Sequence, residues 1–162
     1  MGKYNDFLQA EFTPPLKWIL NKTLSYDCDH LTEEDIQILR EIDANCTSKG
    51  KISARAGFET NLASVPRSLW SILSPWDIAR ASVIHDYLYY ACQRYFETPG
   101  SNLEKWNRAR KIADKVFLYA MQDSEPQVNK FKILSAYYAV RWFGAKFAKS
   151  SMLLKEENKD GT

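Results

Sequence analysis

The sequence has few cysteines, the residues whose disulfides stabilise small secreted domains. It contains three cysteines, Cys28, Cys46 and Cys92, which are widely spaced and form no Cys-x-x-Cys pair. An odd number at this spacing argues against a disulfide framework and against a cysteine zinc site, and it fits a reducing compartment. Cys92 lies seven residues after His85, so on a helix the two share a face, and we expect Cys92 to be a small core residue.

The sequence also lacks a large charge imbalance and long apolar runs. The formal net charge is +2, too small to imply nucleic acid or an anionic membrane as the main partner. No apolar run has transmembrane length, and the first residues carry neither a secretory nor a myristoylation signal. We therefore expect no nucleic acid partner, no transmembrane segment and no secretion by a signal peptide.

The patterning predicts an α+β fold in a single domain over residues 1–154. We expect a small N-terminal antiparallel sheet in a sheet-rich part, residues 1–67, and a packed bundle of three main helices in residues 68–154. The charged residues 155–162 are expected to form a disordered, solvated tail.

In the first part, short alternating runs broken by Pro and Asn predict two or three strands within residues 1–29. Thr32 and Asp35 have the spacing of a capping box, and the apolar residues after them predict an amphipathic helix up to Ile42. Residues 51–56 alternate and predict a strand that runs into Gly57 and Phe58. An ordered loop over residues 59–67 is expected next.

In the second part, Ser74, followed by Pro75 and Asp77, is typical of a helix N-terminus, and this helix is expected to run to about Phe96. Ser101 and Glu104 have capping-box spacing and predict the start of a second helix that runs to about residue 121. Ser124–Gln127 predicts the start of a third helix, with Gly144 at its end or at a kink.

His85 and Asp86 are the most informative residues, because a histidine and an acid inside an apolar helix cost desolvation unless they have partners. His85 and Tyr89 are four residues apart and share a helix face, while Asp86 points about 100° away from His85. The turn at Pro99–Gly100 predicts an antiparallel helix hairpin, and Asp114 follows this turn at the distance at which His85 precedes it. Asp114 is therefore expected at the level of His85, where it would fix the histidine tautomer and leave the other ring nitrogen to polarise water.

This arrangement resembles the phospholipase A2 pattern of His-Asp-x-x-Tyr on one helix and Asp on its antiparallel neighbour. The resemblance implies His85 as general base, Asp114 as its orienting carboxylate, Asp86 as a calcium ligand and Tyr89 as a supporting hydrogen bonder. The sequence departs from that family because it has no clear glycine-rich calcium loop and none of the family's disulfides.

A longer resemblance, over residues 51–144, is to a small bacteriophage and prophage family of unknown function. Its blocks here are Gly-Phe-Glu-Thr-Asn-Leu-Ala-Ser-Val-Pro-Arg at residues 57–67, His-Asp-Tyr-Leu-Tyr at 85–89, Arg-x-x-x-Asp-x-x-Phe at 110–117 and Val-Arg-Trp-Phe-Gly at 140–144. Asn61 stands where that family usually has Asp, so it can offer a cation a carbonyl oxygen but no charge, and a metal site there should be weak or absent.

Each of these residues also has a simpler structural interpretation. Asp114 could pair with Arg110 on the helix surface, Tyr89 could be a core residue, and the Thr60–Arg67 loop, with Ser64, could only pin the passage from strand to helix. His30 is expected to be a surface loop residue rather than a metal ligand. The aromatic third helix is expected to be core, or a partner-binding face if exposed, and its basic residues are expected to form its solvated side: Lys130, Lys132, Arg141, Lys146 and Lys149.

Two functions follow from these interpretations. The first is a phage-encoded hydrolase-like protein, in the narrowest form a calcium-dependent phospholipid esterase, with Asp86 and Asn61 at the metal and Thr60, Ser64 and Arg67 in the substrate loop. The second is a non-enzymatic phage protein, either a virion component or a binder of a host factor, in which the His-Asp cluster is structural. Either would act in the host cytoplasm or in the virion.

Overall fold

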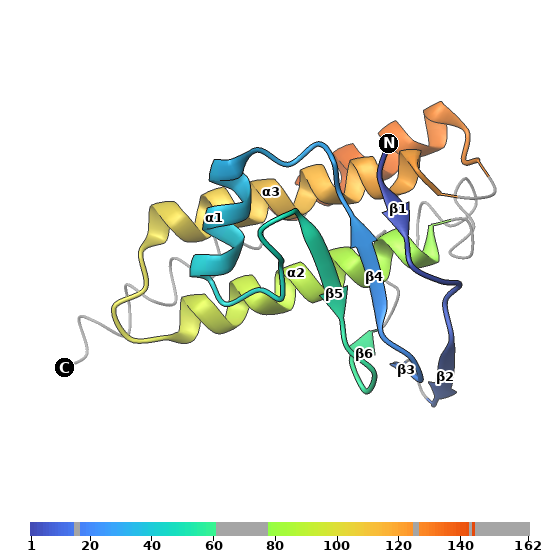
Figure 1. Cartoon of the computed structure of the whole chain (residues 1–162), viewed down its shortest axis with the longest axis horizontal. Helices are drawn as coiled ribbons and strands as arrows, with labels where there is room; N and C mark the ends of the chain where they lie inside the picture. The colour runs from blue at the N-terminus through green and yellow to red at the C-terminus, as the bar shows by residue number, and fades with distance from the viewer. Residues whose placement is uncertain (15–16, 61–77, 125–126, 143, 145–162) are drawn as a thin grey trace.

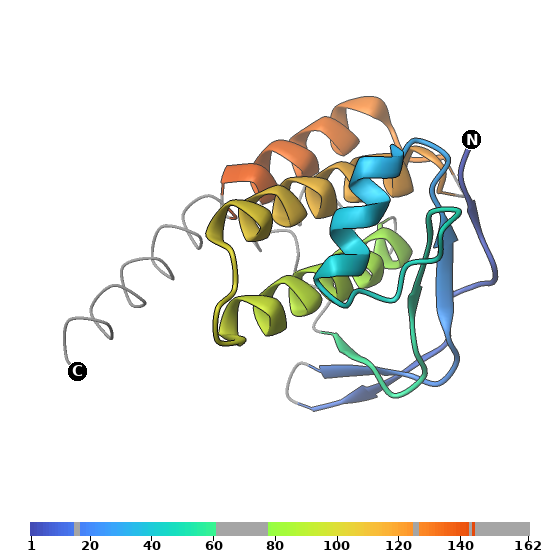
Figure 2. The same ribbon diagram turned by 60° about the vertical axis from the view of Figure 1, so that its left-hand side comes forward.

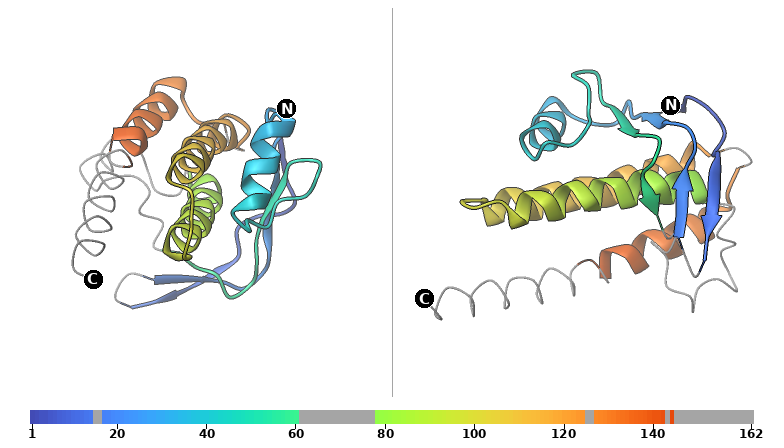
Figure 3. Two further views of the ribbon diagram at one scale, coloured as in Figure 1. Left: turned by 90° about the vertical axis from the view of Figure 1, so that its left-hand side faces the viewer. Right: turned by 90° about the horizontal axis from the view of Figure 1, so that it is seen from below.

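The computed structural model describes residues 1–14, 17–60, 78–124, 127–142 and 144, and these form an α+β fold, as predicted. A hairpin of two long helices lies between two other layers (Figure 1). On one side are the strands and helix α1, Glu33–Glu41, and on the other is a helix formed by residues 130–142, called the outer helix below (Figures 2 and 3).

The strands form two small antiparallel sheets instead of one. The first has the order β1 (Lys3–Tyr4), β4 (Leu24–Asp27), β5 (Lys51–Ala54), and the second has the order β2 (Ala10–Thr13), β3 (Lys17–Leu20), β6 (Glu59–Thr60). Four strands therefore lie in residues 1–29, where the sequence predicted two or three. The first two residues of the predicted 59–67 loop belong to β6, in which Thr60 pairs with Trp18. This pairing is non-local, so it left no signal in the local pattern.

Helix α1 begins as its sequence predicts. Thr32 is the N-cap, its side-chain oxygen accepts the Asp35 backbone N–H, and the Asp35 carboxylate accepts the Thr32 N–H in return. The buried side chains Ile38 and Leu39 attach the helix to the core. The capping-box prediction is therefore confirmed.

The hairpin consists of α2, Ala79–Glu97, and α3, Leu103–Gln122. The N-cap of α2 is Ile78, which makes no side-chain cap, and the predicted start at Ser74 lies outside the described residues. The predicted start of α3 is wrong by one residue, because Asn102 accepts the Lys105 N–H while the Ser101 hydroxyl donates to the Phe96 carbonyl. Both helices end within two residues of the expected position.

The outer helix begins later than predicted. Residues 127–129 are irregular, helix starts at 130, and the Asn129 side chain accepts the Phe131 N–H. Ser124 does not start this helix, because its hydroxyl donates back to the Ala120 carbonyl at the end of α3. Gly144 is helical. Residues 125–126 and the predicted tail lie outside the described residues.

One apolar core connects the layers. Its largest fully buried side chains come from both sheets and from α1, α2 and α3, and they include Tyr26, Leu39, Trp106 and Phe117. The outer helix adds Ile133, Ala136 and Val140. Cys28, Cys46 and Cys92 are buried and unpaired. Among the described residues, no helix is long and apolar enough to cross a membrane.

Candidate functional site

Asp114 is the centre of a buried polar cluster inside the helix hairpin. Its side chain is only 3% exposed, and its two oxygens face three side chains, two from α2 and one from the outer helix. One oxygen contacts His85 Nε2 at 3.2 Å and accepts the Tyr89 hydroxyl at 2.8 Å, and the other accepts Arg141 Nη1 at 3.4 Å. The predicted contact at one level of the hairpin is therefore present.

His85 occupies the α2 side of this cluster. Its side chain is 5% exposed, and its ring packs against Tyr89 and Phe117 with centroid distances of 4.3 and 4.9 Å. With Asp114 as the acceptor at Nε2, the hydrogen is placed on that nitrogen, and Nδ1 is then the basic nitrogen. The contact of one ring nitrogen with Asp114 was predicted, and the role of the other nitrogen in polarising water stays a prediction.

Tyr89 and Arg141 complete the shell around the carboxylate. Burial, together with the neighbouring Asp114 charge, raises the pKa of Tyr89 above its usual value, so its hydroxyl stays protonated and donates. Arg141 brings a cation from the outer helix. The simpler interpretation of Asp114, a surface pair with Arg110, is wrong, because both side chains are buried. Arg141 was expected on the solvated side; its side chain is 40% exposed and also contacts Asp114.

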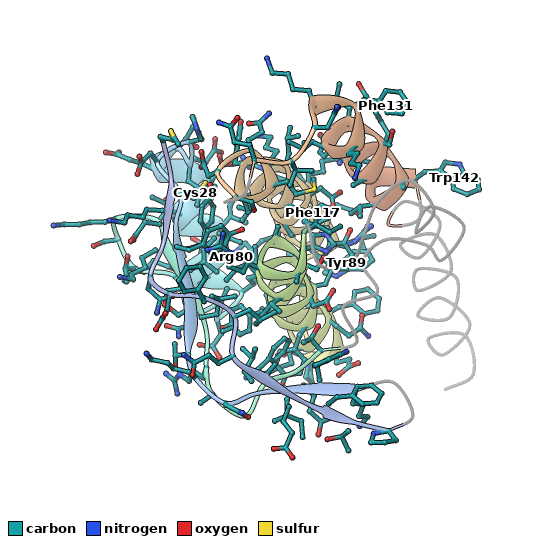
Figure 4. All side chains as sticks on the ribbon, turned by 90° about the vertical axis from the view of Figure 1, so that its right-hand side faces the viewer. Cys28, Arg80, Tyr89, Phe117, Phe131 and Trp142 are labelled. Atoms are coloured by element: carbon teal, nitrogen blue, oxygen red, sulfur yellow. The ribbon has the colours of Figure 1, made fainter. Side chains whose placement is uncertain are left out.

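Arg110 has a different role in the same region. It is buried, its guanidinium lies 5.6 Å from the Tyr89 ring centre and 5.0 Å from that of Trp106, and it donates to the Gly144 carbonyl. Figure 4 shows Tyr89 on the side of the hairpin that faces the outer helix, and Arg80 on the side that faces the strands. The cluster therefore connects α2 and α3 with the outer helix.

Asp86 points away from His85, as predicted, and lies at the surface. Its carboxylate accepts the Thr60 hydroxyl at 2.5 Å, which ties the second sheet to α2. Asp86 and Thr60, with Phe58, Tyr89 and Tyr90, line an open depression of about 360 Å³. Tyr89 lines this depression and also belongs to the polar cluster. Arg141, whose side chain is 40% exposed, is a second point at which the cluster approaches solvent.

The described residues offer little to a metal ion. They contain no group of three or more His, Cys, Asp or Glu side chains that could bind one, whereas Ca²⁺ takes six to eight oxygen ligands. The predicted metal ligand Asn61 and the predicted loop residues Ser64 and Arg67 lie outside the described residues. His30 is an exposed loop residue, as expected, and its ring stacks on Tyr119 at 4.5 Å.

A family model for proteins of unknown function, DUF1353, matches residues 36–140. The chain belongs to the DUF1353 family. The matched segment includes Thr60, His85, Asp86, Tyr89 and Asp114, so the whole α2–α3 part of the cluster lies within the DUF1353 region. No curated protein and no solved structure matches the chain. The phage origin and the likeness to phospholipase A2 therefore stay predictions.

Arg110 and Arg141 were not predicted to belong to the polar region around Asp114. Arg110 lies within the DUF1353 match and Arg141 lies one residue beyond it. Both arginines stand in blocks of the family resemblance, Arg-x-x-x-Asp-x-x-Phe and Val-Arg-Trp-Phe-Gly. These blocks were the available signal, because an arginine among apolar residues suggests a buried anion or carbonyl partner. The basic residues of this helix were together assigned to its solvated side, so the contact of Arg141 with Asp114 was not predicted.

Proposed function

We propose that this protein is a hydrolase in which His85 is the general base that activates water for attack on an ester. The observation that carries the proposal is the buried Asp114 carboxylate, which contacts His85 Nε2 and accepts the Tyr89 hydroxyl. A carboxylate in this position fixes the tautomer and stabilises the imidazolium that forms when His85 takes a proton from water. Such positioned proton transfer contributes roughly 10²- to 10⁴-fold to a rate.

The depression beside Asp86 is the proposed substrate side of the site. Thr60 and Asp86 present polar groups there, and the rings of Phe58, Tyr89 and Tyr90 present an apolar wall. An ester with an acyl chain, including a phospholipid, matches this combination of one polar edge and an aromatic wall. No step of the proposed hydrolysis is assigned to calcium, because among the described residues only Asp86 and Glu59 bring carboxylates to this depression, whereas Ca²⁺ takes six to eight oxygen ligands. The assay below also tests calcium dependence.

A test compares the wild-type protein with His85→Gln on phosphatidylcholine–phosphatidylglycerol vesicles and on p-nitrophenyl esters. We expect loss of at least about 10²-fold in hydrolysis in the variant, with the melting temperature and circular dichroism spectrum retained. His30→Gln is the matched control, since it replaces the other histidine in an exposed loop. Equal activity in His85→Gln and wild type overturns the proposal. Repeating the assay with added calcium and with a chelator shows whether hydrolysis requires calcium, as ligation of the ion by Asp86 predicts.

The alternative, a non-enzymatic protein in which the cluster is structural, is favoured by two specific observations. The His85 side chain is 5% exposed, and Arg141 already balances the Asp114 charge from the outer helix. A structural role predicts that no ester is hydrolysed and that His85→Gln lowers the melting temperature instead. The same pair of measurements therefore separates the two functions.

A further inference from the structure

The outer helix has apolar side chains on two opposite faces. Its buried face is formed by Ile133, Ala136 and Val140, which belong to the core. Its other face presents a row that we call the apolar stripe: Phe131, Leu134, Tyr138 and Trp142. Their spacing of three, four and four residues places them on one side of a helix.

The apolar stripe is exposed. Phe131 is 69% accessible, Tyr138 66% and Trp142 63%. Figure 4 shows Phe131 and Trp142 projecting away from the hairpin, on the side opposite to the strands. Large aromatic side chains gathered on one exposed face are typical of a surface that binds a partner.

Charge shows what kind of partner fits. At about 100° per residue, Lys130 flanks the apolar stripe on one side and Lys132 flanks it on the other. Arg141 lies on the same side as Lys130, but its guanidinium contacts Asp114. The segment between Glu125 and Glu156 contains no Asp or Glu but six basic residues: Lys130, Lys132, Arg141, Lys146, Lys149 and Lys155. The formal charge of this segment is +6, so the rest of the chain carries +2 − 6 = −4. The small net charge of the whole chain conceals this separation.

We propose that the apolar stripe docks onto an anionic lipid surface. A helix that lies in a membrane interface combines aromatic and aliphatic residues on the buried face with Lys and Arg at its edges, where they reach anionic head groups. Tyr and Trp suit this depth because each has an apolar ring and a polar edge. The stripe has both features, and its basic flanks lie on either side of its aromatic centre.

Charge complementarity also argues against a second copy of this chain as the occupant. A symmetric interface would place the basic flanks of two outer helices against each other, and like charges at close range oppose association. Nucleic acid fits less well, because phosphates require the basic residues at the centre of the contact, whereas here the centre is aromatic. The proposal is independent of hydrolysis by His85, since no member of the stripe contacts that residue among the interactions described above.

The test is cosedimentation of the full chain with vesicles of phosphatidylcholine alone and of phosphatidylcholine with phosphatidylglycerol. We expect binding to the anionic vesicles that weakens with added salt. The double variant Phe131→Ser, Tyr138→Ser should lose binding, and its matched control is Phe7→Ser, an exposed phenylalanine near the strands. Loss of Lys130 and Lys132 to Gln should weaken binding by roughly fivefold per lysine, whereas Lys111→Gln, Lys115→Gln on exposed positions of α3 should leave it unchanged.

Several results overturn the proposal. They are no binding of wild type to anionic vesicles, equal binding to both vesicle types, or equal loss in the control variants. A concentration-dependent dimer that becomes a monomer in the serine double variant, without vesicle binding, assigns the stripe to self-association. If the serine variant fails to fold, the lysine variants and vesicles with brominated acyl chains decide: these chains should quench wild-type tryptophan fluorescence more than that of Trp142→Phe.

Discussion

At the residue scale, the single carboxylate of Asp114 holds three other side chains in place. Its carboxylate is nearly inaccessible and accepts hydrogen bonds from Tyr89 and Arg141 while it contacts His85. Hydrogen bonds to charged groups contribute about 1.5–3 kcal/mol each, and a buried donor left without a partner costs a similar amount. The hydrogen bonds that Tyr89 and Arg141 donate to Asp114 are therefore expected to stabilise the fold whether or not His85 is catalytic.

We predict that Asp114→Asn lowers the melting temperature by roughly 4–10 °C, because the neutral amide replaces the charge facing Arg141. Differential scanning calorimetry measures the change. Glu104→Gln is the matched control on an exposed position of the same helix, and it should change the melting temperature by about 1 °C or less. An unchanged melting temperature for Asp114→Asn would contradict a stabilising cluster.

The three cysteines give a second prediction for individual residues. Burial raises the pKa of Cys46 to about 11 and that of Cys92 to about 12, and it raises the pKa of Cys28 as well. The thiolate is the reactive form of cysteine. The folded protein should therefore react slowly with iodoacetamide at a pH near the ordinary thiol pKa of about 8.5. Mass spectrometry should show three labelled cysteines only after denaturation. Rapid labelling of the native chain would contradict the burial.

At the scale of elements, Gly144 determines how closely the outer helix approaches the hairpin. A Cβ at this position would lie 2.5 Å from the Tyr89 hydroxyl and 2.9 Å from Arg110 Nη2. Real Cβ atoms do not approach other atoms so closely, so one of the two side chains would have to move, and both belong to the site. Glycine is required here for space, not for backbone conformation.

Gly144→Ala is therefore expected to destabilise the protein by about 1–3 kcal/mol and to weaken the contact of Tyr89 with Asp114. The free energy of unfolding in urea measures the first effect. Ser135→Ala serves as the control, because it changes a half-buried position of the outer helix without adding a Cβ. Equal free energies of unfolding for Gly144→Ala and wild type would contradict this prediction, because they would mean that the helix can shift without loss of stability.

At the scale of the whole molecule, buried phenols connect the layers. Burial raises the pKa of Tyr4, Tyr26 and Tyr89 above the usual value. Tyr4 donates to the Ala120 carbonyl, and Tyr26 donates to Asp123 at 2.6 Å, so the first sheet is attached to the end of α3. These phenols therefore hold separate elements together only while they are protonated.

The folded-state pKa values lie above the unfolded ones, so this stabilisation is fully present below the unfolded value and is lost as pH rises towards the folded value. Unfolded thiols and phenols ionise near pH 8.5 and about 10. We predict a plateau of melting temperature up to about pH 8.5 and a fall above it, with a smaller fall in Tyr26→Phe. If all nine tyrosines titrate normally in the folded chain, the prediction is wrong.

The sequence by itself determined the α+β class, the capping box of α1, the helix hairpin and the pairing of His85 with Asp114. These depend on local patterns: apolar periodicity, cap spacing, and equal rise along two helices joined by a short turn. Such features need little information from the rest of the chain, which is why their residues were identified in advance.

Only the tertiary structure decided what surrounds that pair. It placed β6 beside β3, replaced Arg110 by Arg141 as the cation facing Asp114, and exposed the apolar stripe of the outer helix. Periodicity cannot supply these results, because a helix with apolar residues on two faces does not show which face meets the core. That choice depends on the free energy of the whole packing arrangement. The contacts of Arg110, Gly144 and the hairpin place one face of the outer helix against the core and leave its other face exposed.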